Sequence, residues 1–327
     1  NGIFSMFGIR VKVLFYYLVC FVSVAAGQPI IAWDRVEHDT SGQSESTLLY
    51  YQVYRESFPG FVPAAENFIG ATLDTVFQLT DSDTSDIWYY KVTCTDSWGN
   101  RSGYASSVSK LPYVTTAVRV MLHAALSARD TMNTTLSLNQ LLPADSPYSD
   151  APRNLHSFPE HVVDWIKVGL SDSVGGSVRT VQSFLLKPDG RVVEPDGRTT
   201  QIGLPDVPAG KYYLHVFHRN HKHIISSAKL PMSSVCDSVY DFTVSSDMYY
   251  NKQGCVSVGS EKWAQQAGDL DHDNDVDQDD FMIWYNQAKN GVSGYSVSDI
   301  NCDGMVTTRD YQYWYNTVYR NLPEHGF

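Results

Sequence analysis

The chain has 327 residues, which is enough for two or three domains. Its formal net charge is −12, and residues 268–310 carry ten Asp against only Lys289 and Arg309. This acidic balance argues against nucleic acid as a partner, because a phosphate backbone attracts clustered Lys and Arg.

An apolar run of twelve residues, 13–24, lies near the start of the sequence. Arg10 and Lys12 precede it, and the small residues Ala25-Ala26-Gly27 follow it. Twelve apolar residues are too few to cross a bilayer, whereas this order of regions is typical of a secretory signal peptide. We therefore expect a signal peptide over residues 1–27, a secreted or cell-surface protein, and no membrane span in the mature chain.

Four cysteines follow the expected cleavage site: Cys94, Cys236, Cys255 and Cys302. Disulfides are permitted in an oxidising compartment, and four cysteines allow three pairings. The short separation along the sequence favours Cys236–Cys255.

Residues 28–110 contain short runs of strand-forming residues bounded by turn residues. We expect strands at 30–33, 49–55, 75–79, 88–95 and 104–108. The alternation in the fourth run predicts a strand with one buried face. This segment resembles a fibronectin type III module on Trp33, Tyr51-x-Val53-Tyr54-Arg55, Trp88-Tyr89-Tyr90-Lys91-Val92-Thr93, Asp96, Gly99-Asn100 and Ser102. The resemblance implies a β-sandwich that serves as a spacer or an interaction surface.

Residues 111–260 contain strand candidates at 117–124, 162–170, 181–186, 211–219, 224–230 and 239–244. Pro188-Asp189-Gly190 and Pro195-Asp196-Gly197 indicate turns. The expected product is a second antiparallel β-sandwich of unknown function. The segment also resembles a domain of secreted Bacteroidetes-type proteins, which is often followed by calcium repeats. The residues that carry this resemblance are Met132-Asn133, Leu138, Pro147-Tyr148, Val162-Val163-Asp164-Trp165-Ile166, Val168, Leu170, Leu185-Leu186, Asp189-Gly190, Gly210, Tyr212-Tyr213, His218-Arg219-Asn220-His221 and Asp241-Phe242-Thr243.

Four histidines, His215, His218, His221 and His223, lie within nine residues at and just after the strand candidate 211–219. On an extended chain His215, His221 and His223 share a face, and His218 points away. Three imidazoles could bind zinc or copper, with Asp164 or His161 as a further ligand. The alternatives are a strand end with exposed histidines, where Arg219 and Asn220 organise a turn, and a ligand-binding surface.

Catalytic motifs are missing from the sequence. It has no Gly-x-Ser-x-Gly, His-Glu-x-x-His or phosphate-loop pattern. Glycoside hydrolysis needs two positioned carboxylates, and Asp164 beside Trp165 is better explained as a strand residue. We therefore expect a protein that is not an enzyme.

Residues 261–323 contain a tandem sequence repeat whose two copies are 30 residues apart. The recurring pairs are Asp269/Asp299, Asp273/Asp303, Val276/Val306, Asp280/Asp310, Trp284/Trp314, Tyr285/Tyr315 and Asn286/Asn316. Each copy has side-chain oxygens at positions 1, 3, 5, 9 and 12 of a twelve-residue loop, which is the spacing of an EF-hand calcium loop.

The sequence thus predicts two Ca²⁺ sites, each with a backbone carbonyl at position 7. The expected ligands are Asp269, Asp271, Asp273, Asp275, Asp277 and Asp280 in the first loop, and Asp299, Asn301, Asp303, Met305, Thr307 and Asp310 in the second. Position 6 needs a residue that tolerates positive φ, and Asn274 and Gly304 occupy it. Val276 and Val306, at position 8, are placed to pair across the loops.

Each loop is followed by a helical pattern of apolar residues. The expected buried faces are Phe281, Trp284, Tyr285 and Ala288 after the first loop, and Tyr311, Trp314, Tyr315 and Val318 after the second.

The duplicated pattern resembles a dockerin type I domain, an EF-hand-like module of secreted bacterial proteins. The resemblance implies a cohesin partner in a polysaccharide-degrading assembly. Loop positions 10 and 11, which are usually small hydroxyl residues in dockerins that bind cohesins, are here Gln278-Asp279 and Thr308-Arg309, so only Thr308 keeps that pattern. The expected partner is therefore a cohesin-like or another cell-surface receptor.

Together these patterns predict a mainly β, multidomain chain: two antiparallel β-sandwiches followed by a small α-helical, dockerin-like domain. The expected function is that of a secreted or cell-surface modular binding protein with calcium-dependent docking. The alternative is an accessory component of an extracellular glycoside hydrolase assembly that binds polysaccharide through its β-domains.

Overall fold

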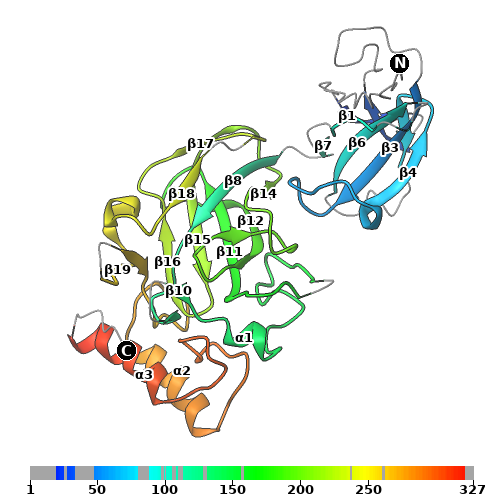
Figure 1. The fold of residues 1–327 in the computed structure, drawn as a ribbon. Helices are drawn as coiled ribbons and strands as arrows, with labels where there is room; N and C mark the ends of the chain where they lie inside the picture. The colour runs from blue at the N-terminus through cyan, green and yellow to red at the C-terminus, as the bar shows by residue number, and fades with distance from the viewer. Residues whose placement is uncertain are drawn as a thin grey trace, which may run out of the picture. The chain divides into compact units, whose positions relative to one another are not determined.

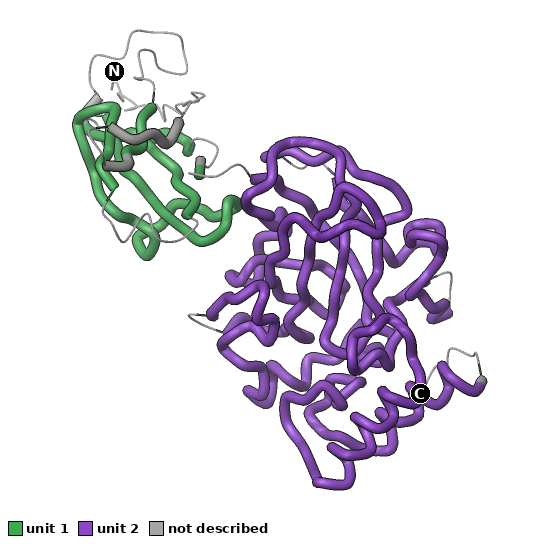
Figure 2. The backbone as a smooth tube through the Cα atoms, turned by 180° about the vertical axis from the view of Figure 1, so that it is seen from behind, with its two compact units in different colours: residues 1–111 green, residues 112–327 purple. Residues whose placement is uncertain are grey.

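The computed structural model describes residues 20–25, 28–33, 48–79, 88–96, 99, 101–104, 108–109, 113–127, 131–155, 158–235, 238–259 and 262–320. The chain forms two compact units, residues 1–111 and residues 112–327 (Figure 2). Strands far outnumber helices, so the expectation of a mainly β protein is confirmed. Within the described ranges, no helix is long and apolar enough to cross a membrane.

The first unit contains two antiparallel sheets (Figure 1). The three-stranded sheet has the order β1 (Cys20–Ala25), β2 (Gln28–Trp33), β5 (Val76–Gln78). The four-stranded sheet has the order β4 (Phe68–Thr72), β3 (Leu48–Glu56), β6 (Tyr89–Asp96), β7 (Val108–Ser109). A 3-10 turn, η1 (Ala65–Asn67), precedes β4.

Strands are found at four of the five expected places, and the fifth starts later, at Val108. Two strands are not expected from the sequence. β4 contains Gly70, which weakens a strand pattern, but a Cβ there would lie 2.6 Å from the Phe77 ring. β1 occupies part of the segment predicted as a signal peptide and pairs with β2. The rest of that predicted peptide, residues 1–19 and 26–27, lies outside the described residues.

The prediction that one face of β6 is exposed is wrong, because all eight of its residues are buried. Tyr90 and Val92 belong to the core of the first unit. On the opposite face, Lys91 donates through Nζ to the carbonyl of Phe61 (2.6 Å) and lies over the rings of Phe61 and Tyr104. Burial lowers the pKa of Lys91 to about 8. The segment around Phe61 thus covers a face that the alternation pattern assigns to solvent.

The second unit is built on two larger sheets (Figure 1). The six-stranded sheet has the order β13 (Val192–Val193), β12 (Val178–Leu186), β11 (Asp164–Ser171), β15 (Gly210–His218), β16 (His221–Ile225), and β17 (Leu230–Met232) also pairs with β15. The three-stranded sheet has the order β14 (Ile202–Pro205), β8 (Tyr113–Arg119), β18 (Val239–Asp241). Two small hairpins join β9 (Leu126–Ser127) to β10 (Thr131–Met132), and β19 (Cys255–Ser257) to β20 (Trp263–Gln265).

Two expectations for this unit are corrected. Its sheets are not wholly antiparallel, because β18 runs parallel to β8. The expected strand at 224–230 is interrupted: β16 ends at Ile225, and β17 begins at Leu230. Ser226 causes the break, since its hydroxyl accepts the amide of Leu214 and donates to the carbonyl of Ala228.

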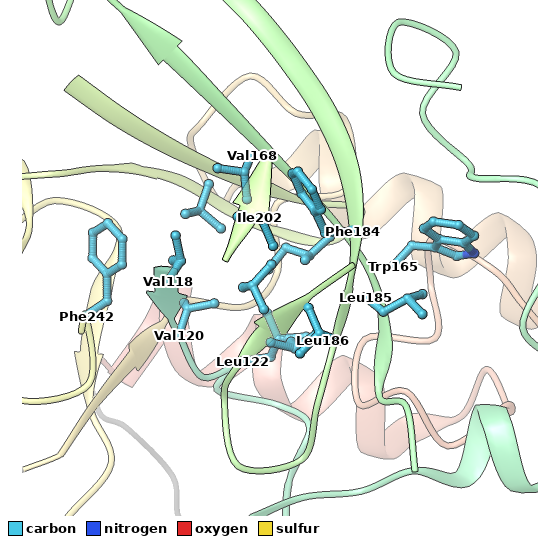
Figure 3. Close-up of a cluster of buried hydrophobic side chains, with 14 of the residues drawn as sticks. Val118, Val120, Leu122, Trp165, Val168, Phe184, Leu185, Leu186, Ile202 and Phe242 are labelled. Atoms are coloured by element: carbon cyan, nitrogen blue, oxygen red, sulfur yellow. The ribbon is translucent and has the colours of Figure 1, made fainter. Parts of the chain in front are cut away.

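One hydrophobic core joins the two larger sheets. Figure 3 shows Val118, Val120 and Ile202 on one side of this core, with Val168 and Phe184 of the six-stranded sheet on the other. Trp165 lies on the other face of β11, where it is fully buried (Figure 3). There its indole Nε1 donates to the carbonyl of Pro143 (2.9 Å).

Short helical segments complete the second unit: α1 (Thr135–Leu138), η3 (Ser246–Met248), η4 (Tyr250–Lys252), α2 (Gln278–Lys289), α3 (Thr308–Tyr315) and the π-helical turn η5 (Asn316–Arg320). The repeat therefore gives two loop–helix elements. Of the expected apolar faces, Trp284 and Trp314 are buried, whereas Tyr285 and Val318 remain exposed.

The two helices are joined reciprocally through their tryptophans. The indole of Trp284 donates to the carbonyl of Thr307 (3.2 Å), and that of Trp314 donates to the carbonyl of Asp277 (2.6 Å). Both carbonyls are at position 9 of the opposite loop. Phe281 packs on Trp314, with ring centroids 5.1 Å apart. The sequence duplication thus produces an approximately symmetric pair.

Candidate metal centres

The first loop, residues 269–280, gathers three carboxylates. Asp269, Asp271 and Asp273 each offer an oxygen, and these oxygens lie within 4.8 Å of one another. Two Asx turns hold the curl, because Asp271 Oδ1 accepts the amide of Asp273 (3.2 Å) and Asp273 Oδ1 accepts that of Asp275 (2.7 Å). Positions 1, 3 and 5 of the expected ligand set therefore converge.

The second loop, residues 299–310, repeats this local structure. Asn301 Oδ1 accepts the amide of Asp303 (3.0 Å), and Asp303 Oδ1 accepts that of Met305 (2.9 Å). The carboxylate of Asp299 additionally accepts the amides of Asp303 (3.0 Å) and Gly304 (3.1 Å). Equivalent residues thus make equivalent turns in both loops.

Left-handed backbone occurs at two positions of each loop. At position 6 the φ angle is 73° for Asn274 and 84° for Gly304, as the sequence predicts. At position 4 it is 68° for His272 and 58° for Cys302. Sequence reasoning misses this second left-handed position, because His is enriched at positive φ but Cys is not, so the two copies share no signal there.

Position 12 closes each loop by hydrogen bonds. The carboxylates of Asp280 and Asp310 each accept the backbone amides of positions 2, 3 and 9 of their own loop. A carboxylate has about four lone-pair positions, so Asp280 keeps part of its capacity for a cation, whereas Asp310 also accepts the Thr307 hydroxyl (3.3 Å). Asp at position 12 is one methylene shorter than the Glu that is usual in EF-hand loops. Through these hydrogen bonds it ties each loop to the first turn of the following helix.

Positions 7 and 9 have other roles as well. Asp277 and Thr307, at position 9, cap α2 and α3 by accepting the amides of Asp279 (2.8 Å) and Arg309 (3.2 Å). At position 7, the side chain of Asp275 is 82% exposed, and that of Met305 is also exposed. Only their main-chain carbonyls remain for a cation.

The donor set fits a hard divalent cation. Asp269 is 1% exposed, and its Oδ1 has no hydrogen-bond partner among the described residues. Burial, together with the charge of Asp280, raises the pKa of Asp269 to about 7. Burial also raises the pKa of Asp299 to about 7, although the Arg219 charge opposes this shift. Clustered oxygen donors with an unsatisfied buried carboxylate suit calcium.

A divalent cation held by these loops is expected to bind more tightly as pH rises from 6 to 8. Protons compete for Asp269 and Asp299, whose pKa values are both raised to about 7. One such competing proton makes binding about tenfold weaker at pH 6 than at pH 8. In the calcium-free protein, the same raised pKa values make stability fall as pH rises through 7, because the folded state holds protons that the unfolded state has released. Calorimetric titration at both pH values measures the effect, and an unchanged affinity would contradict it.

The turn between β15 and β16 inserts into the second loop. Asn220 Nδ2 donates to the carbonyls of Val297 (3.1 Å) and Asp299 (2.8 Å). Arg219 Nη2 lies 3.6 Å from Asp299 Oδ2, and its Nη1 donates to the carbonyl of Ser296. The histidine-rich segment therefore docks the β-domain onto the loop that begins at Asp299.

A buried charge network supports this turn. Asp164 accepts hydrogen bonds from Arg219 Nε (2.7 Å), Tyr295 Oη (2.8 Å) and His218 Nε2 (3.2 Å). Burial alone would raise the pKa of Asp164, but the charge of Arg219 and the hydrogen bond from His218 outweigh it and hold the pKa below its usual range. Asp164 is therefore a buried anion with a fixed cationic partner.

The expected arrangement of the histidines is wrong in two respects. His215, His218 and His221 are buried rather than exposed. His218 pairs with His221 (Nδ1 to Nδ1, 3.1 Å), and His215 pairs with His223 (Nδ1 to Nε2, 2.9 Å). The tight turn and a bulge between Val216 and His218 shift the alternation that an unbroken strand would give.

These histidines are neutral members of hydrogen-bond chains. Burial lowers the pKa of His215 to about 4 and that of His223 to about 3. Ligand atoms of Asp164, His218 and Cys302 do lie within 4.8 Å of one another. Arg219 contacts both Asp164 and Cys302, however, so this cluster already contains its cation. His161 is exposed and belongs to no such group within the described chain.

Solvent reaches the second loop through a cavity of about 370 Å³. Asn301 and Asp303, at positions 3 and 5, line it together with Arg309, Asn133 and Tyr313. The loop is thus accessible to an ion, although Asp299 is buried.

The expected disulfide is not formed at Cys255, which is a free thiol whose Sγ donates to the carbonyl of Lys252 (3.3 Å). Cys302 is also a free thiol and is buried. Cys236 lies outside the described residues.

Comparison with known proteins gives weak similarities. No protein-family model matches the chain, and no curated protein matches it. Among solved structures, a type II cohesin–X–dockerin complex from Acetivibrio cellulolyticus is 14% identical, over 62% of this chain and 92% of that chain, with a TM-score of 0.30. An α-L-rhamnosidase from Dictyoglumus thermophilum is 12% identical, over 66% of this chain and 29% of that chain, with a TM-score of 0.20. At these TM-scores neither similarity identifies the fold or the function.

Proposed function

We propose that this chain is a non-catalytic, modular binding protein, secreted or displayed on a bacterial cell surface, whose C-terminal repeat binds two calcium ions. In this proposal two β-sandwiches precede an EF-hand-like, dockerin-like domain that docks to a cohesin-like or other cell-surface receptor. The observation that carries it is the first loop, where Asp269, Asp271 and Asp273 converge and the buried Oδ1 of Asp269 has no hydrogen-bond partner among the described residues.

Calcium would act in this protein as a structural ion. The first loop carries seven carboxylates, from Asp269 to Asp280, and they repel one another at neutral pH. A bound cation removes this repulsion at the N-terminal end of α2. Because each tryptophan bonds to the opposite loop, ordering either loop also orders the other helix.

Full-length protein is expected to bind two calcium ions in calorimetric titrations, with dissociation constants in the range of about 10⁻⁴–10⁻³ M that is usual for extracellular modules. A hundredfold excess of calcium over a dissociation constant would stabilise the fold by about 2.7 kcal/mol per site. Thermal unfolding followed by circular dichroism, with calcium and with chelator, measures that gain.

Matched variants of the first loop make this test specific. Asp271→Ala removes the carboxylate of an expected ligand at position 3, whereas Asp279→Ala removes the same group from an exposed residue at position 11. The first change should abolish one binding event, and the second should leave both. Absence of any binding at millimolar calcium would refute the proposal.

A further inference from the structure

The two loops differ in the charge of their expected ligands. In the first loop, all five side-chain ligand positions are Asp. In the second, Asn301 and Thr307 are neutral, and only three positions carry Asp. Calcium affinity rises with the number of charged ligands, so composition alone favours the first loop.

The guanidinium of Arg219, in the β15–β16 turn, lies beside position 1 of the second loop and is fixed there by further contacts. The side chain of Arg219 is 6% exposed, and its Nη2 lies 3.6 Å from Asp299 Oδ2. Its Nε donates to Asp164 (2.7 Å), and the guanidinium lies 4.6 Å from the ring centroid of Tyr295. These contacts on other sides keep the charge beside position 1 of the loop.

The first loop has no equivalent buried cation among the residues that the structure describes. Lys222 approaches it, with Nζ 3.8 Å from Asp275 Oδ1. That carboxylate belongs to an 82% exposed side chain at position 7, where water screens the interaction. Asp269, the counterpart of Asp299, instead has an oxygen without a hydrogen-bond partner.

We propose that Arg219 sets the calcium affinity of the second loop, and makes it the weaker of two unequal sites. This inference rests on the proposed function. An ion coordinated by Asp299 would lie close to the guanidinium, in a region where Asp299 is fully buried and screening by water is weak. Arg219 thus neutralises part of the carboxylate charge of the second loop before calcium binds, whereas the first loop needs the ion itself to neutralise its carboxylates.

The experiment isolates each loop in the full-length protein by calorimetry. Asp271→Ala/Asp273→Ala removes the side-chain ligands at positions 3 and 5 of the first loop, and Asn301→Ala/Asp303→Ala removes those of the second. The second loop is expected to bind at least about tenfold more weakly than the first. Equal affinities, within threefold, would overturn the inference while leaving the proposed function intact. Loss of binding in both loops would instead refute the proposed function itself.

Two further variants separate Arg219 from ligand composition, both in the background that lacks the first site. Asp164→Asn/Arg219→Gln removes both members of the buried ion pair and should raise the calcium affinity of the second loop about tenfold. Lys222→Gln is the matched control and should leave that affinity unchanged. If the double variant does not fold, as judged by circular dichroism, Asn301→Asp/Thr307→Asp decides. With ligands equal to those of the first loop, the second loop should still be weaker, and restoration to equal affinity would overturn the role of Arg219.

Discussion

Asp164→Ala is expected to destabilise the second unit by about 3–5 kcal/mol, because it leaves Arg219 without its principal buried anion. The carboxylate is fully buried and accepts hydrogen bonds from Arg219, His218 and Tyr295. All three donors would lose a partner at once. Urea unfolding at neutral pH, with an unchanged slope against denaturant, measures the loss.

A surface ion pair in the same sheet provides the control. Lys167 Nζ contacts Asp150 Oδ2 at 2.8 Å, close to the 2.7 Å between Arg219 and Asp164. The side chain of Asp150 is 56% exposed, so Asp150→Ala should cost less than about 1 kcal/mol. Similar losses for the two alanine variants would show that burial does not distinguish the pairs.

Trp165→Ala is expected to cost about 3–5 kcal/mol of unfolding free energy. Trp165 is fully buried on the face of β11 opposite Val168, and its indole donates to the carbonyl of Pro143. The substitution would leave a large cavity and an unpaired carbonyl beneath the segment that contains Pro143. Guanidinium unfolding reports the change.

Two companion variants divide that loss between packing and hydrogen bonding. Trp165→Phe keeps most of the ring volume and loses the bond to Pro143, so its cost should be about 1–3 kcal/mol. Phe158→Ala removes an aromatic ring that is 51% exposed, and should stay within about 0.5 kcal/mol of the wild type. A loss in Trp165→Phe as large as in Trp165→Ala would assign the whole effect to the hydrogen bond.

Much of the fold follows from local patterns in the sequence. Most long strands lie where β-branched and aromatic residues are bounded by turn residues, and both loop–helix elements begin where the repeat places them. The positive φ of Asn274 and Gly304 is also local, because the tight curl of the loop requires it. Patterns of this kind depend on neighbours in the sequence and need no knowledge of the rest of the chain.

The errors arise where a distant segment decides the outcome. Lys91 is buried because the segment around Phe61 covers it, which strand alternation does not reveal. The histidines change partners because a two-residue turn and a bulge reset the faces of β15 and β16. Likewise, the contact between Arg219 and Asp299 joins residues from separate sequence patterns. This contact depends on the packing of the β15–β16 turn against the second loop, which only the structure shows.

The contact of the β15–β16 turn with the second loop also has a consequence for the order of events during synthesis. Asn220 must wait for Asp299, 79 residues later, before its side chain has its final partner. At about 5–20 residues per second, a ribosome needs roughly 4–16 s to make that stretch. During this interval the six-stranded sheet can form. The ion pair between Arg219 and Asp164 then remains in contact with water, because the second loop is not yet there to cover it. Contacts between residues so distant in sequence slow folding. We therefore infer that the β15–β16 turn reaches its final, buried environment late, when the second loop packs on it.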